Sequence, residues 1–82
     1  MKWPVMYVGV DVSKARLDVA VEPSGEAWMV GNDETGIASL VEWLKGRDVG
    51  RIVVEATGGQ ERLLVAELYQ AGLPVALSLI HI

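Results

Sequence analysis

The first part of the chain alternates between apolar and polar positions in the manner of strands. Residues 5–12 form a valine-rich run interrupted only by Gly9 and Asp11, which is typical of a central strand covered on both faces. After a short polar connection, residues 17–22 alternate with a period of two, as a half-buried strand does. A turn signal then leads to a third expected strand at about residues 27–30. This pattern predicts an antiparallel meander.

The hydrophobic period then changes from that of a strand to that of a helix. Between residues 37 and 44 the apolar side chains recur at i, i+3, i+4 and i+7, which predicts an amphipathic helix. Asn32, Asp33 or Thr35 can cap its start, and Gly46 suits its C-terminal end. We therefore expect one helix directly after the meander.

The remaining sequence predicts a strand, a second helix and a final strand. Residues 51–55 contain a β-branched core, which favours a strand. Residues 57–60 have the spacing of a capping box, which predicts a helix that runs to about Ala71 and ends at Gly72. Residues 74–79 are expected to form the last strand.

The predicted order, β-β-β-α-β-α-β, has consequences for the fold class. A hairpin meander followed by crossover units indicates an α/β fold, a mixed sheet with helices on its faces. This order matches the ribonuclease H-like fold. An ordinary Rossmann-type sheet is the rival, but three opening strands without a helix count against it. We find no internal repeat, linker or low-complexity segment, and 82 residues allow one small domain at most.

Composition and charge narrow the class of function. Half of the residues (51%) are hydrophobic, as in a folding chain, and the absence of cysteine excludes disulfides and thiolate metal sites. No signal peptide or membrane span is recognisable, so we expect a cytoplasmic protein with no membrane partner. The net charge of −4 argues against DNA binding by this chain alone, because phosphate binding requires clustered basic residues.

Two acidic residues stand where predicted strands end. Asp11 lies near the end of the first strand and Glu55 at the end of the fourth. If these strands are neighbours, the two carboxylates project into one crevice, where open sheets bind ligands. Carboxylate oxygens are the ligands that Mg²⁺ prefers, and metal ions so held assist phosphoryl transfer. The alternative is structural: Asp11 caps the following turn, and Glu55 pairs with a lysine or a helix dipole.

Five further residues are weaker candidates for chemistry. Asp18 lies on the second strand and can approach Asp11 across the hairpin as an additional metal ligand, although a solvated polar face is the simpler interpretation. The turn residues Ser13 and Lys14 are candidate nucleic-acid contacts. Gly58 and Gly59 precede a predicted helix and offer free backbone N–H groups to phosphate, but the lysine of a P-loop is missing.

The motifs around the two acids resemble those of a known family. Residues 8–14 (VGVDVSK) followed by residues 17–21 (LDVAV) look like the opening of the DEDD-type insertion-sequence transposases. Residues 54–61 (VEATGGQE) and residues 71–75 (AGLPV) are similar to the second motif of the same family. The resemblance covers about residues 5–76, with both motifs in the family's order.

The resemblance implies a fold, an activity and partners. The N-terminal domain of these transposases is RuvC-like, and Asp11 and Glu55 match the first aspartate and the glutamate of its metal-binding acidic tetrad. The implied activity is Mg²⁺- or Mn²⁺-dependent DNA cleavage and joining during transposition of an insertion sequence. The implied partners are DNA, a structured guide (bridge) RNA in some members, and further copies of the full-length protein. A bacterial or archaeal cytoplasm is the implied location.

The chain also departs from the family pattern. The last two aspartates of the tetrad and the C-terminal domain with its serine nucleophile are not in this sequence. Residues 77–82 (LSLIHI) replace the family's Asn-Pro and basic helical segment, so we suspect a non-native tail there. We therefore expect residues 1–82 to be a truncated RuvC-like N-terminal domain, inactive as a fragment.

Two other classes of function stay open. Actin-like ATPases and sugar kinases also open with a strand, an aspartate and a hairpin. Their phosphate hairpin typically has glycine two residues after that aspartate, where this chain has Ser13. A stand-alone acidic interaction domain, in which the strand-end acids are only structural, is the non-enzymatic alternative.

Overall fold

The computed structural model describes residues 5–56 and 58–79, which form a five-stranded sheet and two helices. The elements follow one another as β1 (Met6–Val12), β2 (Arg16–Glu22), β3 (Ala27–Gly31), α1 (Glu34–Lys45), β4 (Val49–Ala56), α2 (Arg62–Gln70) and β5 (Val75–Leu79). This is the order β-β-β-α-β-α-β, so the order expected from the sequence is confirmed.

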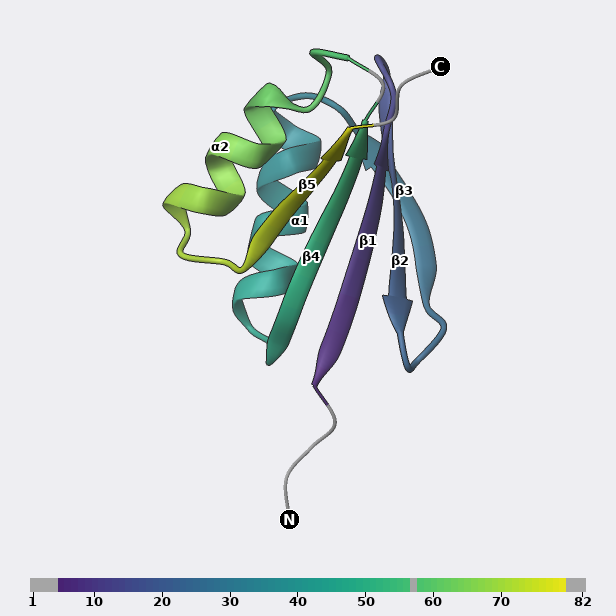
Figure 1. Cartoon of the computed structure of the whole chain (residues 1–82), viewed down its shortest axis with the longest axis vertical. Helices are drawn as coiled ribbons and strands as arrows, with labels where there is room; N and C mark the ends of the chain where they lie inside the picture. The colour runs from purple at the N-terminus through teal and green to yellow at the C-terminus, as the bar shows by residue number, and fades with distance from the viewer. Residues whose placement is uncertain (1–4, 57, 80–82) are drawn as a thin grey trace.

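The sheet is mixed, with strand order β3-β2-β1-β4-β5 (Figure 1). Strands β1, β2 and β3 form the expected antiparallel meander, whereas β4 pairs parallel to β1 and β5 pairs parallel to β4. Parallel neighbours require a crossover connection, which α1 and α2 provide. As a result β1 lies in the middle, between its neighbour in sequence and a strand from the second half of the chain.

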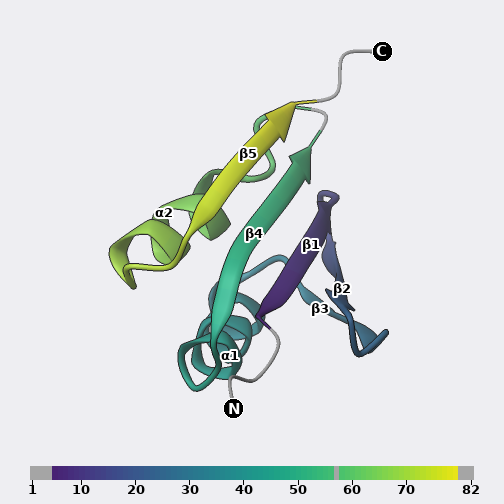
Figure 2. The same cartoon turned by 60° about the horizontal axis from the view of Figure 1, so that its bottom comes forward.

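Both helices cover the same face of the sheet, as the two views in Figures 1 and 2 show. In β1 the side chains of Val8, Val10 and Val12 are buried, while Tyr7 is 58% exposed and Asp11 is exposed. The expectation of a central strand covered on both faces, with helices on both faces of the sheet, is therefore wrong for the described residues. The physical reason is that successive side chains of the valine-rich run point alternately to the covered and to the uncovered side of the sheet.

We call the uncovered side of the sheet the open face. It carries the side chains that alternate with the buried ones along the four strands β1 to β4. Its members include large apolar, small and charged residues, and they are Tyr7, Gly9, Asp11, Asp18, Ala20, Glu22, Met29, Arg51, Val53 and Glu55.

The hydrophobic core lies between the sheet and the helices. Leu40 and Leu44 of α1 and Leu64 and Leu68 of α2 are fully or almost fully buried against the valines of the sheet. Burying one such side chain stabilises the fold by about 1.5–3 kcal/mol relative to leaving it in water. The leucines at this helical spacing therefore fix which side of each helix faces the sheet.

An aromatic pair joins β3 to α1 at the margin of the core. The ring centroids of Trp28 and Trp43 are 4.7 Å apart, with the ring planes inclined at 58°. The guanidinium of Arg47 lies 3.9 Å from the centroid of the Trp43 ring and donates a hydrogen bond to the Trp43 carbonyl oxygen. Such tilted aromatic and cation–π contacts add to the apolar burial and help to fix the end of α1 against β3.

The start of α1 agrees with the sequence, and the start of α2 does not. Asp33 is the N-cap of α1 and accepts a 2.7 Å hydrogen bond from the Gly36 amide, and Gly46 is the C-cap. The second helix begins only at Arg62, with Glu61 at its N-cap and no side-chain cap bond. The helix therefore starts later than the sequence predicts, and Thr57, the first residue of the predicted capping box, lies outside the described residues.

The junction between β3 and α1 is tight because two glycines meet there. A Cβ atom added to Gly36 would collide with the carbonyl oxygen of Gly31, which is backbone and cannot move aside cheaply. The first turn of α1 therefore lies directly on the end of β3. Glycine is required at position 36 by this close approach and not by an unusual φ angle.

Two remaining expectations concern the chain end and the membrane. Strand β5 continues through Leu79, so the first three residues of segment 77–82 pair with β4, and residues 80–82 lie outside the described part. In the part of the chain that the structure describes, no helix combines the length and apolar character needed to cross a membrane.

The core assignment predicts effects of very different size on the free energy of unfolding for two adjacent leucines of α2. Leu64 is fully buried, whereas Leu63 is 41% exposed. We expect Leu64→Ala to lower the free energy of unfolding by about 2–5 kcal/mol, because it opens a cavity. Leu63→Ala should change it by about 0.5 kcal/mol or less. Urea unfolding followed by circular dichroism measures both, and equal losses would contradict the assignment of the buried face.

The tight junction predicts that two glycine-to-alanine changes affect the melting temperature differently. Helix propensity alone would raise the free energy of unfolding of Gly36→Ala by about 1 kcal/mol. Overpacking against Gly31 lowers it by about 1–3 kcal/mol. We therefore expect a lower melting temperature for this variant. The control, Gly46→Ala, has open space and a φ of −84°, so its melting temperature should hold or rise. A stabilised Gly36→Ala variant would show that the junction is loose.

Candidate metal centre

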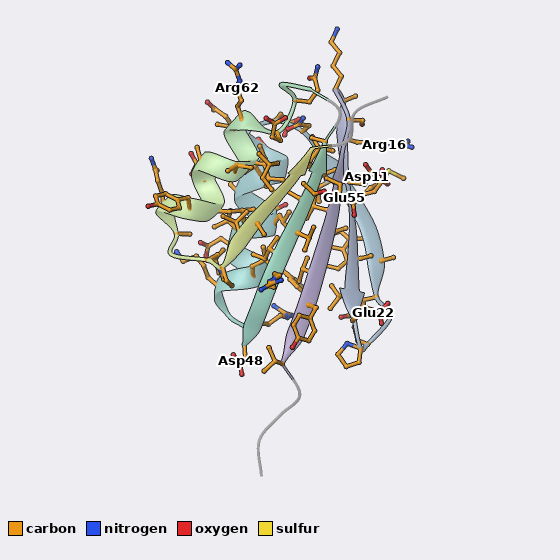
Figure 3. The ribbon with its side chains drawn as sticks, in the orientation of Figure 1. Asp11, Arg16, Glu22, Asp48, Glu55 and Arg62 are labelled. Carbon is orange, nitrogen blue, oxygen red and sulfur yellow. The ribbon has the colours of Figure 1, made fainter. Side chains whose placement is uncertain are left out.

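The parallel pairing of β1 with β4 brings Asp11 and Glu55 side by side. The two residues are register partners, so their Cα atoms lie about 4.8 Å apart, the spacing of neighbouring strands. Both side chains are exposed on the open face, because Val10 and Val54, which precede them, point into the core. Figure 3 shows the two acids close together near the carboxyl ends of their strands.

Asp18 adds a third carboxylate to the same row. It is the antiparallel register partner of Asp11, with a Cα separation of about 4.5–5.5 Å. Its Oδ2 atom lies 3.3 Å from the Nε atom of Arg16, a pair that is about half exposed. The carboxylates of β2, β1 and β4 therefore stand next to one another, with one guanidinium at the end of the row. The sequence analysis did not single out Arg16.

Like charges at directly opposed positions of a sheet repel one another. Asp11 has a carboxylate neighbour on each side, Asp18 on β2 and Glu55 on β4. Such a pair is destabilising, and the half-exposed ion pair of Arg16 with Asp18 offsets only part of this. The row of acids is thus an arrangement that a divalent cation would stabilise.

The donor set fits a Mg²⁺ or Mn²⁺ ion bound by few protein ligands. The three carboxylates border an open hollow of about 380 Å³ that is also lined by Gly9, Val10, Val19, Ala20 and Ala27. Within residues 5–56 and 58–79, no three acidic, histidine or cysteine side chains converge on one point. Mg²⁺ is typically held by one or two carboxylates, waters and phosphate oxygens, which Asp11 and Glu55 can match.

The hairpin turn after Asp11 contains the predicted contacts Ser13 and Lys14. The Ser13 hydroxyl donates to the Arg16 carbonyl oxygen at 3.0 Å and accepts from the Arg16 amide at 3.3 Å. Its hydrogen bonds are therefore used within the turn. Lys14 is exposed, and no ion pair of Lys14 is present in the described ranges. Of the two, Lys14 has the side chain that can reach a phosphate.

Gly58 and Gly59 lie in the loop after Glu55 but not at the start of a helix. Since α2 begins at Arg62, Gln60 and Glu61 separate the glycines from the first helical amides. The Glu61 side chain is only 9% exposed, and its Oε1 atom has no hydrogen-bond partner among the described residues. A buried carboxylate at a helix N-terminus competes with any bound anion, so this loop is a poorer phosphate site than its sequence indicates.

Asn32 has a role that the sequence analysis missed. We considered it only as one of several caps for the first helix, but Asp33 is the cap. The Asn32 side-chain amide instead donates to the carbonyl oxygens of Ser13, at 2.8 Å, and Gln60, at 3.0 Å. An asparagine directly before an adequate aspartate cap is the one sequence signal that could have pointed to another use.

Comparison with solved structures confirms the fold class. T. thermophilus RuvC, solved in complex with a Holliday junction substrate, aligns with a TM-score of 0.68 over 93% of this chain at 13% identity. The present chain spans 65% of that chain. The ethanolamine utilization protein EutJ from Carboxydothermus hydrogenoformans aligns with a TM-score of 0.47, at 13% identity over 98% of this chain and 38% of its own.

Comparison by sequence identifies the family. None of the curated proteins matches the chain at a significant level. A family model of the IS110-type DEDD transposases, described as a transposase, matches residues 8–79. This span includes both motifs that suggested the resemblance, together with the helix and strands between them. The chain belongs to the IS110-type DEDD transposase family and has a RuvC-like, ribonuclease H-like fold.

Proposed function

We propose that this chain is the N-terminal part of the catalytic domain of a DNA transposase or recombinase. In this proposal Asp11 and Glu55 hold Mg²⁺ or Mn²⁺ for DNA strand cleavage and joining during insertion-sequence transposition. The observation that carries it is the register pairing of these two acids at the carboxyl ends of β1 and β4, on the open face. Family membership and the fold shared with RuvC, which was solved with a Holliday junction, support it.

The residues of this chain would supply part of the chemistry. When bound, Mg²⁺ acts as a Lewis acid toward phosphate oxygens and lowers the pKa of a coordinated water. Asp11 and Glu55 provide the anionic oxygens that hold the ion, and Asp18 contributes negative charge beside them. The chain spans 65% of the RuvC chain it resembles. The acidic tetrad that the family resemblance implies includes two aspartates besides Asp11 and Glu55. We therefore expect these 82 residues alone to bind metal without cleaving DNA.

DNA binding would rest mainly on other parts of the full-length protein. The net charge of this chain is −4, and phosphate contacts require positive charge. Lys14, exposed at the tip of the hairpin, is the contact that we assign to DNA here, with Ser13, Gly58 and Gly59 as backbone contacts near it. A structured guide RNA and self-association of the full-length protein belong to the same proposal through family membership.

The first test of the proposal is metal binding by matched variants. We expect Asp11→Asn and Glu55→Gln each to weaken Mn²⁺ binding at least about tenfold, the lower bound seen when even an outer partner of a metal ligand is lost. The controls Asp48→Asn and Glu22→Gln make the same chemical changes at the opposite end of the sheet (Figure 3) and should leave the Kd unchanged. Isothermal titration calorimetry of the whole chain provides the measurement.

The same experiment separates the alternatives. Equal Kd values in all four variants and the wild type would remove the metal-site assignment. If ATP raises the melting temperature and Mn²⁺ alone does not, a phosphate-binding domain of the kinase type is favoured, because a ligand that binds the folded state stabilises it. Absence of both responses would leave a non-catalytic interaction domain.

The row of like charges generates a second, independent prediction. Asp11 faces a carboxylate on both neighbouring strands, so its removal relieves repulsion. We expect Asp11→Asn to raise the free energy of unfolding in EDTA by up to about 1 kcal/mol. Residues that serve function often lower stability in this way. Urea unfolding tests this. If the variant is instead less stable without metal, Asp11 has a structural role such as capping the turn.

A further inference from the structure

The side chain of Asn32 connects three segments of the chain. It lies between the end of β3 and the N-cap of α1. Its Nδ2 atom donates to the carbonyl oxygen of Ser13 at 2.8 Å and to that of Gln60 at 3.0 Å. Its backbone amide donates to the Ala15 carbonyl oxygen at 3.1 Å. One residue therefore holds the turn that follows Asp11 and the loop that follows Glu55.

The two segments that Asn32 holds have no other described hydrogen bond between them. The register of β1 with β4 ends at the pair formed by Asp11 and Glu55. Beyond that pair, none of the hydrogen bonds among the described residues joins segment 13–15 directly to segment 58–60. Among the described residues, the Asn32 amide is thus the hydrogen-bonded link between these two segments.

The chemistry of this bridge requires a short side chain with two N–H donors. An asparagine amide has two such hydrogens, and here each faces one carbonyl oxygen. An aspartate of the same shape would turn an acceptor oxygen toward two acceptors. Serine offers one donor, and alanine offers none. The position is therefore matched to asparagine by hydrogen bonding and not by helix capping, which Asp33 performs.

The backbone that carries Asn32 is held firmly. On one side Gly31 lies against Gly36, so closely that a Cβ atom at position 36 would collide with the Gly31 carbonyl oxygen. On the other side Asp33 accepts a 2.7 Å hydrogen bond from the Gly36 amide. The first turn of α1 therefore fixes the backbone on both sides of Asn32 and so sets the position from which its side chain extends.

We propose that Asn32 is a positioning residue of the metal centre: its amide couples the segments after Asp11 and Glu55 and so holds both carboxylates in the arrangement that binds the ion. The inference rests on the proposed function, because it gives Asn32 a role toward the same two acids. Partners outside the direct ligand shell orient the ligands, and their loss typically costs about 10–100-fold in metal affinity. Asn32 acts on both ligands at once through the backbone.

The test compares Asn32→Ala with a variant that is destabilised elsewhere. Val21→Ala removes a fully buried side chain of β2 at the end of the sheet away from the acids, so it controls for a general loss of stability. With Mn²⁺ alone as the probe, we expect the Kd of Asn32→Ala to rise about tenfold and that of Val21→Ala to stay within about twofold of the wild type. An unchanged Kd in Asn32→Ala beside a binding wild type would overturn the proposal.

Amide hydrogen exchange gives a readout that needs no metal. We expect Asn32→Ala to loosen both segments, read from the nearest hydrogen-bonded amides: that of Ser13, which donates to the Arg16 carbonyl oxygen, and that of Val65, which donates to the Glu61 carbonyl oxygen. Val21→Ala should accelerate exchange in the sheet instead. If neither segment changes, Asn32 does not couple them. If the wild type fails to bind Mn²⁺ but both segments loosen in Asn32→Ala, the proposed function fails while the coupling holds. The two failures are therefore distinguishable.

A second variant keeps the proposal testable if Asn32→Ala does not fold. Asn32→Asp preserves the size of the side chain but replaces both N–H donors with oxygen. Added negative charge near the site would by itself tighten Mn²⁺ binding, whereas release of the two segments weakens it. We expect weaker binding, by about tenfold. Binding as tight as in the wild type, or tighter, would show that charge and not loop position sets the affinity.

Discussion

The pairing of β1 with β4 is the constraint on which the rest of the molecule depends. It joins the antiparallel meander to the crossover half, and its register decides which side chains share a face. Val10 and Val54 are partners in the core, so the next residues, Asp11 and Glu55, are partners on the open face. A slip of this register by one residue would bury one acid and expose valines. Both changes would strongly destabilise the fold. Hydrophobic burial on one side of the sheet therefore sets the geometry of the acids on the other.

Much of the fold follows from local patterns in the sequence, and the parts that do not have a common cause. The order of elements and the cap of α1 by Asp33 can be predicted because period and capping are local properties. The number of covered faces cannot, since Gly9 and Val53 are open-face residues with no polar side chain and hide the alternation. The start of α2 was also predicted too early, because a glycine pair such as Gly58 and Gly59 occurs in loops as readily as before helices.

The residues of the candidate site also differ in whether local sequence patterns could predict them. Asp11 and Glu55 could be singled out because strand ends are visible in sequence, and the short hairpin explains why Asp18 comes to lie opposite Asp11. Arg16 was missed although its partner Asp18 is local, since residues i and i+2 of a strand share a face. Asn32 could not be singled out, because its acceptors are fixed by the tertiary structure. The amide of Asn32 spans segments that are far apart in the sequence, and no local rule states where such a side chain finds its acceptors.

The indole pair at the margin of the core gives this small domain an optical reporter of its own. Trp28 belongs to β3 and Trp43 to α1, and their rings touch only when the helix is docked on the sheet. Rings at this separation and inclination can couple electronically, so we expect the docked state to have a circular dichroism contribution that separated rings lack. Because Asn32 lies in the connection between the same two elements, this signal reports the integrity of the segment beside the acids without any added label.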